Sequence, residues 1–205
     1  KAADYKLAVK TSNGRGVYTF CMCPGGKVIN SSSEAGGIVV NGMSNQARDE
    51  ANANSAVLVT VGPEDFASSH PLAGITYQRE LEQKAFELGG KDYSVPVMRV
   101  EDYLNDTLDL KMEEVSCSVQ PNVRYAKLSQ IFSNEVNLAL KEGLQLMNHK
   151  FTGFTEKAML SGVESRSSAP VRLYRDENFQ SNIKGIMPIG EGAGYAGGIM
   201  SSAID

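Results

Sequence analysis

Apolar and polar positions alternate through the first third of the chain, and this alternation predicts short β-strands. Residues 5–10 place Tyr, Leu and Val against Lys and Ala, which is the period-two pattern of a half-buried strand. The same pattern predicts strands over residues 17–22, 28–29, 36–40 and 56–61, with turn signals at Asn13-Gly14 and Asn41-Gly42. We expect Pro24 to end the second strand. Because the connections are short, the strands predict a small, mostly antiparallel sheet.

A helical period replaces this alternation in the middle of the chain. Residues 72–88 follow a Ser-His-Pro start and precede Gly89-Gly90, so they predict a helix with a defined end. Residues 128–147 carry an apolar stripe at helical spacing and predict a second helix that faces the core. Between them lies the apolar stretch 95–100, where Pro96 disfavours a central strand.

The C-terminal residues 185–205 combine an apolar run with a dense group of glycines. Residues 186–189 predict a buried strand, and residues 193–204 predict a helix of small and apolar side chains. A glycine turn between a strand and a helix directs backbone N–H groups at an anion, usually a phosphate. The alternative is a tight turn that binds no ligand. Glu191 departs from the G-x-G-x-x-G pattern, and its carboxylate suits a ribose or ribityl hydroxyl better than a phosphate.

Composition narrows the function classes. The net charge of −4 predicts no basic surface for nucleic acid, and no apolar run reaches the roughly 18 residues of a membrane span. Three cysteines with one C-x-C pair make no disulfide framework, so we expect a reducing, cytoplasmic compartment. No metal-binding pattern is present. Lys1 is not a methionine, and Asp205 falls inside the predicted helix, so we expect a piece of a longer protein.

Four polar or glycine-bearing stretches could carry chemistry: residues 21–26, 41–54, 164–166 and 190–198. If they meet, they would line a cleft that suits a ligand. Arg48 and Arg166 could bind a carboxylate or phosphate through their forked donors, although a surface ion pair is the more common role of an arginine. Cys21 and Cys23 could form a redox pair, but Pro24 argues against the helix start that usually activates such thiols.

Several motifs in a fixed order resemble a known family. They are T-F-C-M-C-P-G-G-K-V-I-N, S-E-A-G-G-I-V-V-N-G-M-S, N-A-N-S-A-V-L-V-T-V, V-E-S-R-S-S-A-P-V-R and G-I-M-P-I-G-E-G-A-G-Y-A-G-G-I. The chain is similar to the poorly characterised flavoproteins known as FAD-dependent or NAD(FAD)-utilising dehydrogenases. The resemblance implies an α+β fold in which a middle domain interrupts a Rossmann-like FAD domain. The N-terminal G-x-G-x-x-G of that FAD domain is not in this sequence.

The resemblance also implies domain limits and site residues. Residues 1–161 would form the inserted, substrate-side domain, and residues 162–205 would supply the return strand and helix of the FAD domain. The cofactor-binding residues would be Gly190, Glu191, Gly192, Ala193 and Gly194. Residues towards the reactive side of the flavin would be Cys23, Gly25, Gly26, Asn41, Arg48, Glu164 and Arg166.

The resemblance therefore predicts a fragment of an FAD-dependent oxidoreductase, with the substrate, the catalytic residues and the use of NAD left open. We expect the isolated fragment to be inactive and to retain no flavin, because half of the phosphate site would be missing. One alternative is a non-enzymatic module that binds a ligand or a partner. Another is a flavin-dependent RNA-modifying enzyme, which the acidic charge balance disfavours.

Overall fold

The computed structural model describes residues 6–109 and 116–205, and they form an α+β fold, as the sequence predicts. The chain divides into two compact units. Unit 1 comprises Lys1–Val61 and Leu81–Glu164, and unit 2 comprises Gly62–Glu80 and Ser165–Asp205. The predicted limit between an inserted domain and an FAD domain, at residues 161 and 162, stays a prediction.

The long strand β2 (Gly16–Asn30) organises the larger sheet of unit 1. Its first half pairs antiparallel with β1 (Ala8–Lys10) and with β4 (Asn52–Val59). The pairing with β4 continues to Gly26 through a stretch where β2 is bulged and the register shifts. Its second half pairs antiparallel with β3 (Val40–Met43) and parallel with β6 (Val119–Gln120). The sheet is therefore mostly antiparallel, as predicted.

Two predictions in this sheet are wrong, one of a strand end and one of a turn. Pro24 does not end the strand, because the ladder with β4 shifts register between Phe20 and Cys23 and again between Cys23 and Gly26. Such bulges leave residues outside the regular ladder, so a proline is accommodated there. Asn41-Gly42 is no turn either, because both residues pair with β2 inside β3. Gly42 serves close packing instead, since an added Cβ would collide with the Asn54 side chain.

A smaller sheet in unit 1 has the strand order β7 (Val123–Tyr125), β5 (Val95–Arg99), β8 (Met159–Ser161). The prediction from Pro96 is therefore wrong, because β5 is the central strand. The antiparallel ladder with β8 begins at Val97, so the missing N–H of Pro96 falls just outside it. The carbonyl of Pro96 still accepts a hydrogen bond of 3.0 Å from the Gly162 N–H.

The helices form largely where the apolar periodicity predicts them. Helix α1 (Ala73–Leu88) ends at Gly89-Gly90, where Gly90 adopts φ +91°. The predicted second helix is divided into a 3₁₀ turn, η2 (Leu128–Gln130), and α3 (Asn134–Lys150), because the Ser133 hydroxyl caps α3 by accepting from the Val136 N–H at 3.3 Å. A short helix, α2 (Val100–Asn105), follows β5.

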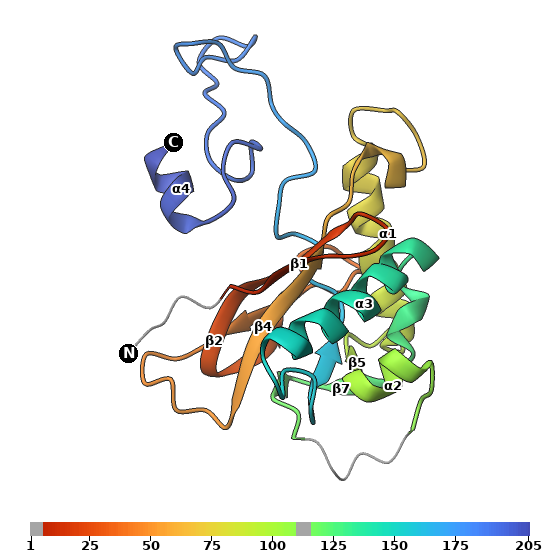
Figure 1. Cartoon of the computed structure of the whole chain (residues 1–205). Coiled ribbons are helices and arrows are strands. Elements are labelled where there is room, and N and C mark those ends of the chain that lie inside the picture. The colour runs from red at the N-terminus through yellow and green to blue at the C-terminus, as the bar shows by residue number, and fades with distance from the viewer. Residues whose placement is uncertain (1–5, 110–115) are drawn as a thin grey trace. The chain divides into compact units, whose positions relative to one another are not determined.

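Helix α3 covers the face formed by β1, β2 and β4 (Figure 1). The buried centre of this contact is Val17, Ala139 and Met147, all fully shielded from solvent. Gly143 lets the helix approach closely, because a Cβ there would lie 2.6–2.8 Å from the side-chain carbons of Val17.

Unit 2 contains the 3₁₀ turn η1 (Pro63–Asp65), the first half of α1 and the six-residue helix α4 (Ile199–Ile204). Its described residues contain no strand. Gln78 on α1 donates hydrogen bonds of 2.8 and 3.2 Å to the carbonyls of Ser165 and Ser168. The Phe66 and Tyr77 rings lie 5.5 Å apart and anchor the segment before α1.

The close approach of α3 to β2 gives a stability prediction. Alanine usually stabilises a helix interior by ~1 kcal/mol relative to glycine. We expect Gly143→Ala to lower the free energy of unfolding by about 1–3 kcal/mol, because the buried Val17 side chain has no room to move away. Urea unfolding measures the effect.

Leu138→Ala on the exposed face of α3 is the matched control, since Leu138 is 55 % exposed. It should change the unfolding free energy by less than about 0.5 kcal/mol. A more stable Gly143→Ala protein would show that the helix and the strand have room between them.

Candidate functional site

The predicted phosphate site of strand, glycine turn and helix does not form as expected. Residues 186–189 make no strand, and Ile186, Met187 and Ile189 are each at least half exposed. The described part of unit 2 contains no strand with which they could pair. The helix begins at Ile199 rather than at residue 193, and it has only six residues.

Glycine conformation explains the late start of α4. Gly194 adopts φ +84° and Gly198 adopts φ +146°, and neither value belongs to a right-handed helix. The predicted helix start at residue 193 is therefore wrong. The glycine turn itself is present: the N–H groups of Gly194 and Tyr195 donate to the carbonyls of Glu191 and Gly190 at 2.9 and 3.1 Å.

The three glycines of this turn have different structural reasons. Gly190 and Gly194 both adopt a positive φ, and a Cβ on Gly194 would also collide with the carbonyl of Val171. Gly192 has neither reason, because its φ lies outside the left-handed region and an added Cβ would meet no atom of the described residues within 4 Å, apart from its chain neighbours. Its backbone is therefore open to approach, which is the condition that a bound cofactor would need.

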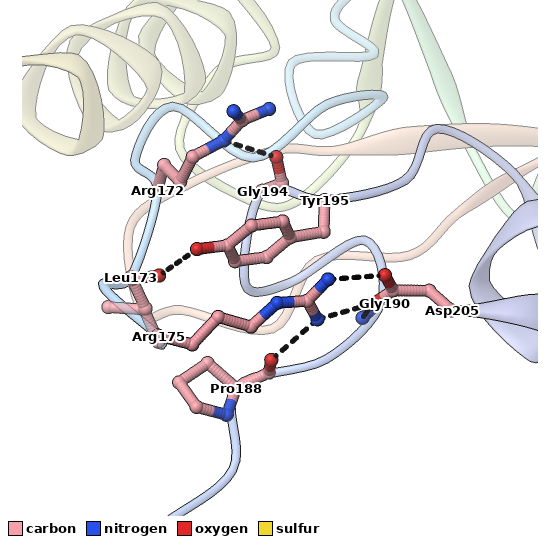
Figure 2. Close-up of polar contacts among 8 residues, drawn as sticks. All are labelled: Arg172, Leu173, Arg175, Pro188, Gly190, Gly194, Tyr195 and Asp205. Atoms are coloured by element: carbon pink, nitrogen blue, oxygen red, sulfur yellow. Dashed lines mark hydrogen bonds and ion pairs between the residues drawn. The ribbon is translucent and has the colours of Figure 1, made fainter. Parts of the chain in front are cut away.

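Four residues that the sequence did not single out as ligands stabilise this turn (Figure 2). Arg175 forms two hydrogen bonds with the Asp205 carboxylate, of 2.8 and 2.6 Å, and a third of 3.0 Å with the carbonyl of Pro188. The Gly190 N–H donates to the same carboxylate at 2.8 Å. Arg172 donates from Nε to the carbonyl of Gly194 at 3.1 Å.

Tyr195 connects the two arginines. The Arg175 guanidinium lies 3.6 Å from the centroid of the Tyr195 ring, and that of Arg172 lies 5.0 Å from it. The Tyr195 hydroxyl donates to the carbonyl of Leu173 at 2.8 Å. No local sequence signal indicates these contacts, because Arg175 and Asp205 are thirty residues apart. The one hint in the sequence is Tyr195, an aromatic residue within the glycine-rich residues 190–198.

In unit 1, the bulged part of β2 brings several of the predicted substrate-side residues together. The Gly25 backbone packs against the carbonyl of Arg48, and buried Gly26 packs against the carbonyl of Met43, so a side chain fits at neither glycine. The Asn54 amide donates to the carbonyls of Lys27 and Met43 at 3.3 and 3.2 Å. This close packing gives Gly25 and Gly26 a structural role.

The remaining predicted residues lie in different surroundings. The Cys23 thiol donates to the carbonyl of Cys21 at 3.6 Å, and neither cysteine forms a disulfide among the described residues. Asn41 is exposed on β3, and Arg48 is exposed in the loop before β4. Half-buried Glu164 ends unit 1, whereas exposed Arg166 belongs to unit 2.

The pKa values of two carboxyl groups are shifted in opposite directions. Hydrogen bonds from Arg175 and from the Gly190 N–H lower the pKa of Asp205 to about 2. Burial raises the pKa of the Glu164 carboxyl above its usual value of 4.5. Asp205 is thus a fixed anion at neutral pH, and Glu164 is the carboxyl whose ionisation the fold opposes.

Among residues 6–109 and 116–205, no three His, Cys, Asp or Glu side chains form a group that could hold a metal ion. In the same part of the chain, no helix has the length and apolarity needed to cross a bilayer.

A polar hollow of about 480 Å³ lies in unit 1 beside Asn30, Ser32 and Tyr93. The Asn30 amide donates to the carbonyl of Tyr93 at 2.9 Å, and the Ser32 hydroxyl donates to the Asn30 side-chain oxygen at 2.5 Å. These wall residues bond one another, and we assign the hollow no ligand.

Two comparisons place the chain among known sequences. Residues 1–167 match the family described as "FAD-dependent protein, C-terminal domain-like". The chain is also 48 % identical over 207 residues to an uncharacterized protein of Clostridium beijerinckii. That alignment covers all of this chain but only 39 % of the relative. The glycine turn lies beyond the residues that match the family.

The raised pKa of Glu164 gives a pH-dependent prediction. A folded-state pKa above the unfolded value means that ionisation costs stability as pH rises through it. We therefore expect Glu164→Gln to be more stable than the wild type at pH 7 and no different where both side chains are neutral, below about pH 4. Thermal unfolding across this pH range measures the difference. Glu177→Gln, at an exposed position, is the matched control.

The pKa of Asp205 is lowered, so its effect on stability has the opposite dependence on pH. Its folded-state pKa of about 2 lies below its ordinary value of 3.8, so its contribution is complete above the ordinary value and is lost as pH falls towards 2. We expect Asp205→Asn to flatten the loss of stability between about pH 4 and pH 2. Acid titrations of the thermal midpoint compare the two proteins. Equal slopes would show that the ion pair is not formed in solution.

Proposed function

We propose a flavin-dependent role for this chain, which belongs to the family described as "FAD-dependent protein, C-terminal domain-like". Membership of the family supports FAD as the cofactor of the longer protein. The finer proposal is that the longer protein is an oxidoreductase of the dehydrogenase type and that this chain contributes part of its flavin site. The proposal assigns no substrate, and it leaves the use of NAD open.

The observation that carries the proposal is the open backbone at Gly192. The turn needs glycine at positions 190 and 194 for its own geometry, whereas position 192 tolerates a side chain within this chain. A cofactor lying against the turn gives a reason for glycine there. Half-buried Glu191 and buried Ala193 flank this position. The Glu191 carboxylate would accept a hydrogen bond from a hydroxyl group of the cofactor.

Apolar exposure in unit 2 supports the same proposal. Seven apolar side chains that flank the turn in sequence are at least half exposed: Ile183, Ile186, Met187, Ile189, Ile199, Met200 and Ile204. A soluble domain rarely leaves so much apolar surface exposed in one region. Since the chain spans only 39 % of its relative, we propose that another part of the longer protein covers these residues and completes the FAD domain.

The bound FAD would supply the electron transfer, and the residues of this chain would bind and orient it. The turn would let the cofactor approach closely, because Gly192 presents backbone and no side chain. In unit 1, Glu164 is a carboxyl group suited to holding a proton, since burial raises its pKa. We propose it as a proton-holding group on the substrate side.

A binding module without chemistry is the second candidate. One observation favours it over a flavin site. The Gly190 N–H, which a cofactor phosphate would use as a donor, is already bonded to the Asp205 carboxylate. The visible absorption spectrum of the purified full-length protein separates the two candidates. A flavin band that is released on denaturation supports the oxidoreductase. A protein that stays colourless after incubation with FAD supports the module.

Substitutions in the turn give a quantitative prediction. We expect Glu191→Ala and Gly192→Val each to weaken FAD binding by the full-length protein about tenfold or more, which corresponds to ~1.4 kcal/mol. The first removes an acceptor, and the second fills the open backbone. Flavin fluorescence titration measures the dissociation constant.

Glu177→Ala is the matched control, because it removes an exposed carboxylate of unit 2 that lies outside residues 190–194. It should retain the wild-type affinity. Unchanged affinity in both turn variants would remove residues 190–194 from the cofactor site.

A further inference from the structure

Arg175 and Asp205 connect three separate stretches of unit 2. Arg175 follows the segment that contains Arg172, Asp205 follows α4, and the Gly190 turn lies between them in sequence (Figure 2). One carboxylate accepts from two guanidinium nitrogens and from one backbone N–H, with donor–acceptor distances of 2.6–2.8 Å. These distances are typical of strong, charge-assisted hydrogen bonds.

The pair is shielded from solvent, unlike an ordinary surface ion pair. The side chains of Arg175 and Asp205 are only 12 % and 15 % exposed. The Tyr195 ring lies 3.6 Å from the guanidinium carbon, and the Phe179 ring lies 4.4 Å from it. Aromatic rings beside a guanidinium limit its conformations and favour the cation, so the fork is fixed in position.

The carboxylate occupies the place that an anionic ligand would need at this turn. The Gly190 N–H is directed at Asp205 instead of outward, and the charge of Arg175 is balanced by the same group. A phosphate would have to displace this carboxylate before it could use either donor. The internal carboxylate therefore leaves Glu191 and Gly192 as the part of the turn that can face a ligand.

We propose that Arg175 and Asp205 are positioning residues, whose carboxylate–guanidinium pair holds the Gly190 N–H and thereby fixes the turn against which the cofactor lies. The proposal rests on the proposed flavin-binding function. It adds that an internal carboxylate, and no phosphate of the ligand, fills the anion position at Gly190. Neither side chain touches the cofactor.

Chemical rescue tests the structural half of this proposal without any flavin. Asp205→Ala leaves a hole between the Arg175 fork and the Gly190 N–H that fits a small carboxylate. In the full-length, flavin-free protein, we expect amide hydrogen exchange at residues 190–195 to become at least about tenfold faster, as for a loss of ~1.4 kcal/mol. Formate should restore slow exchange, whereas neutral formamide should not.

Two controls accompany the exchange measurement. Glu177→Ala removes an exposed carboxylate of unit 2, and Lys184→Gln removes an exposed cation. Both should exchange like the wild type, with and without formate. If exchange at residues 190–195 is the same in Asp205→Ala as in the wild type, the proposal is wrong, whatever happens to flavin binding.

Flavin titration tests the positioning half. Arg175→Gln and Asp205→Ala should each weaken FAD binding about tenfold, and the double variant should be no weaker than either single variant, because both act through one interaction. Formate should strengthen FAD binding by Asp205→Ala and leave Glu177→Ala unchanged. Additive losses without rescue would mean that the two residues act independently, which overturns the proposal.

The outcomes distinguish this proposal from the proposed function. If the wild type binds FAD and the variants bind it equally well, the positioning role is wrong and the flavin function stands. If the wild type itself binds no FAD, the proposed function fails and the positioning role fails with it. In that case the exchange result still decides whether Asp205 fixes the turn.

Discussion

Strand β2 is the constraint on which unit 1 depends. A strand of fifteen residues exchanges partners along its length, from β1 and β4 at its start to β3 and β6 at its end. The change occurs through bulges, where glycine backbone lies directly against the carbonyls of Arg48 and Met43. Helix α3 then covers the first half of the strand at a distance that only Gly143 allows. The fold of unit 1 follows from these close backbone approaches as much as from apolar burial.

Unit 2 depends on a different kind of interaction, because its described residues contain no sheet. Hydrogen bonds and aromatic contacts around Arg175 take the place of a strand ladder and give the Gly190 turn its shape. The apolar side chains of residues 183–189 and 199–204 stay exposed instead of forming a core. Under the proposed function, another part of the longer protein covers these side chains, since the chain spans 39 % of its relative.

Two observations support the flavin proposal, one from the family and one from the geometry of the turn. The match to the family covers residues 1–167, whereas the turn with the open backbone lies in residues 190–194. The family thus supports the cofactor, and the geometry of Gly192 supports the place where the cofactor would lie. Glu164 adds a carboxyl group of raised pKa at the end of unit 1.

Sequence periodicity determined the α+β class, most strands at the start of the chain and the positions of α1 and most of α3, because burial of one face imposes a period on the residues themselves. The strand predicted over residues 36–40 was wrong, because β3 begins only at Val40. It also marked the glycine turn. It failed at Pro24, Asn41-Gly42 and Pro96, where local turn preferences were overridden by strand pairing with distant residues. It failed again at residues 186–189, where an apolar run lacks any strand partner in the described part of unit 2. Only the tertiary structure could show that Arg175 and Asp205 meet, since no local pattern encodes a contact across thirty residues.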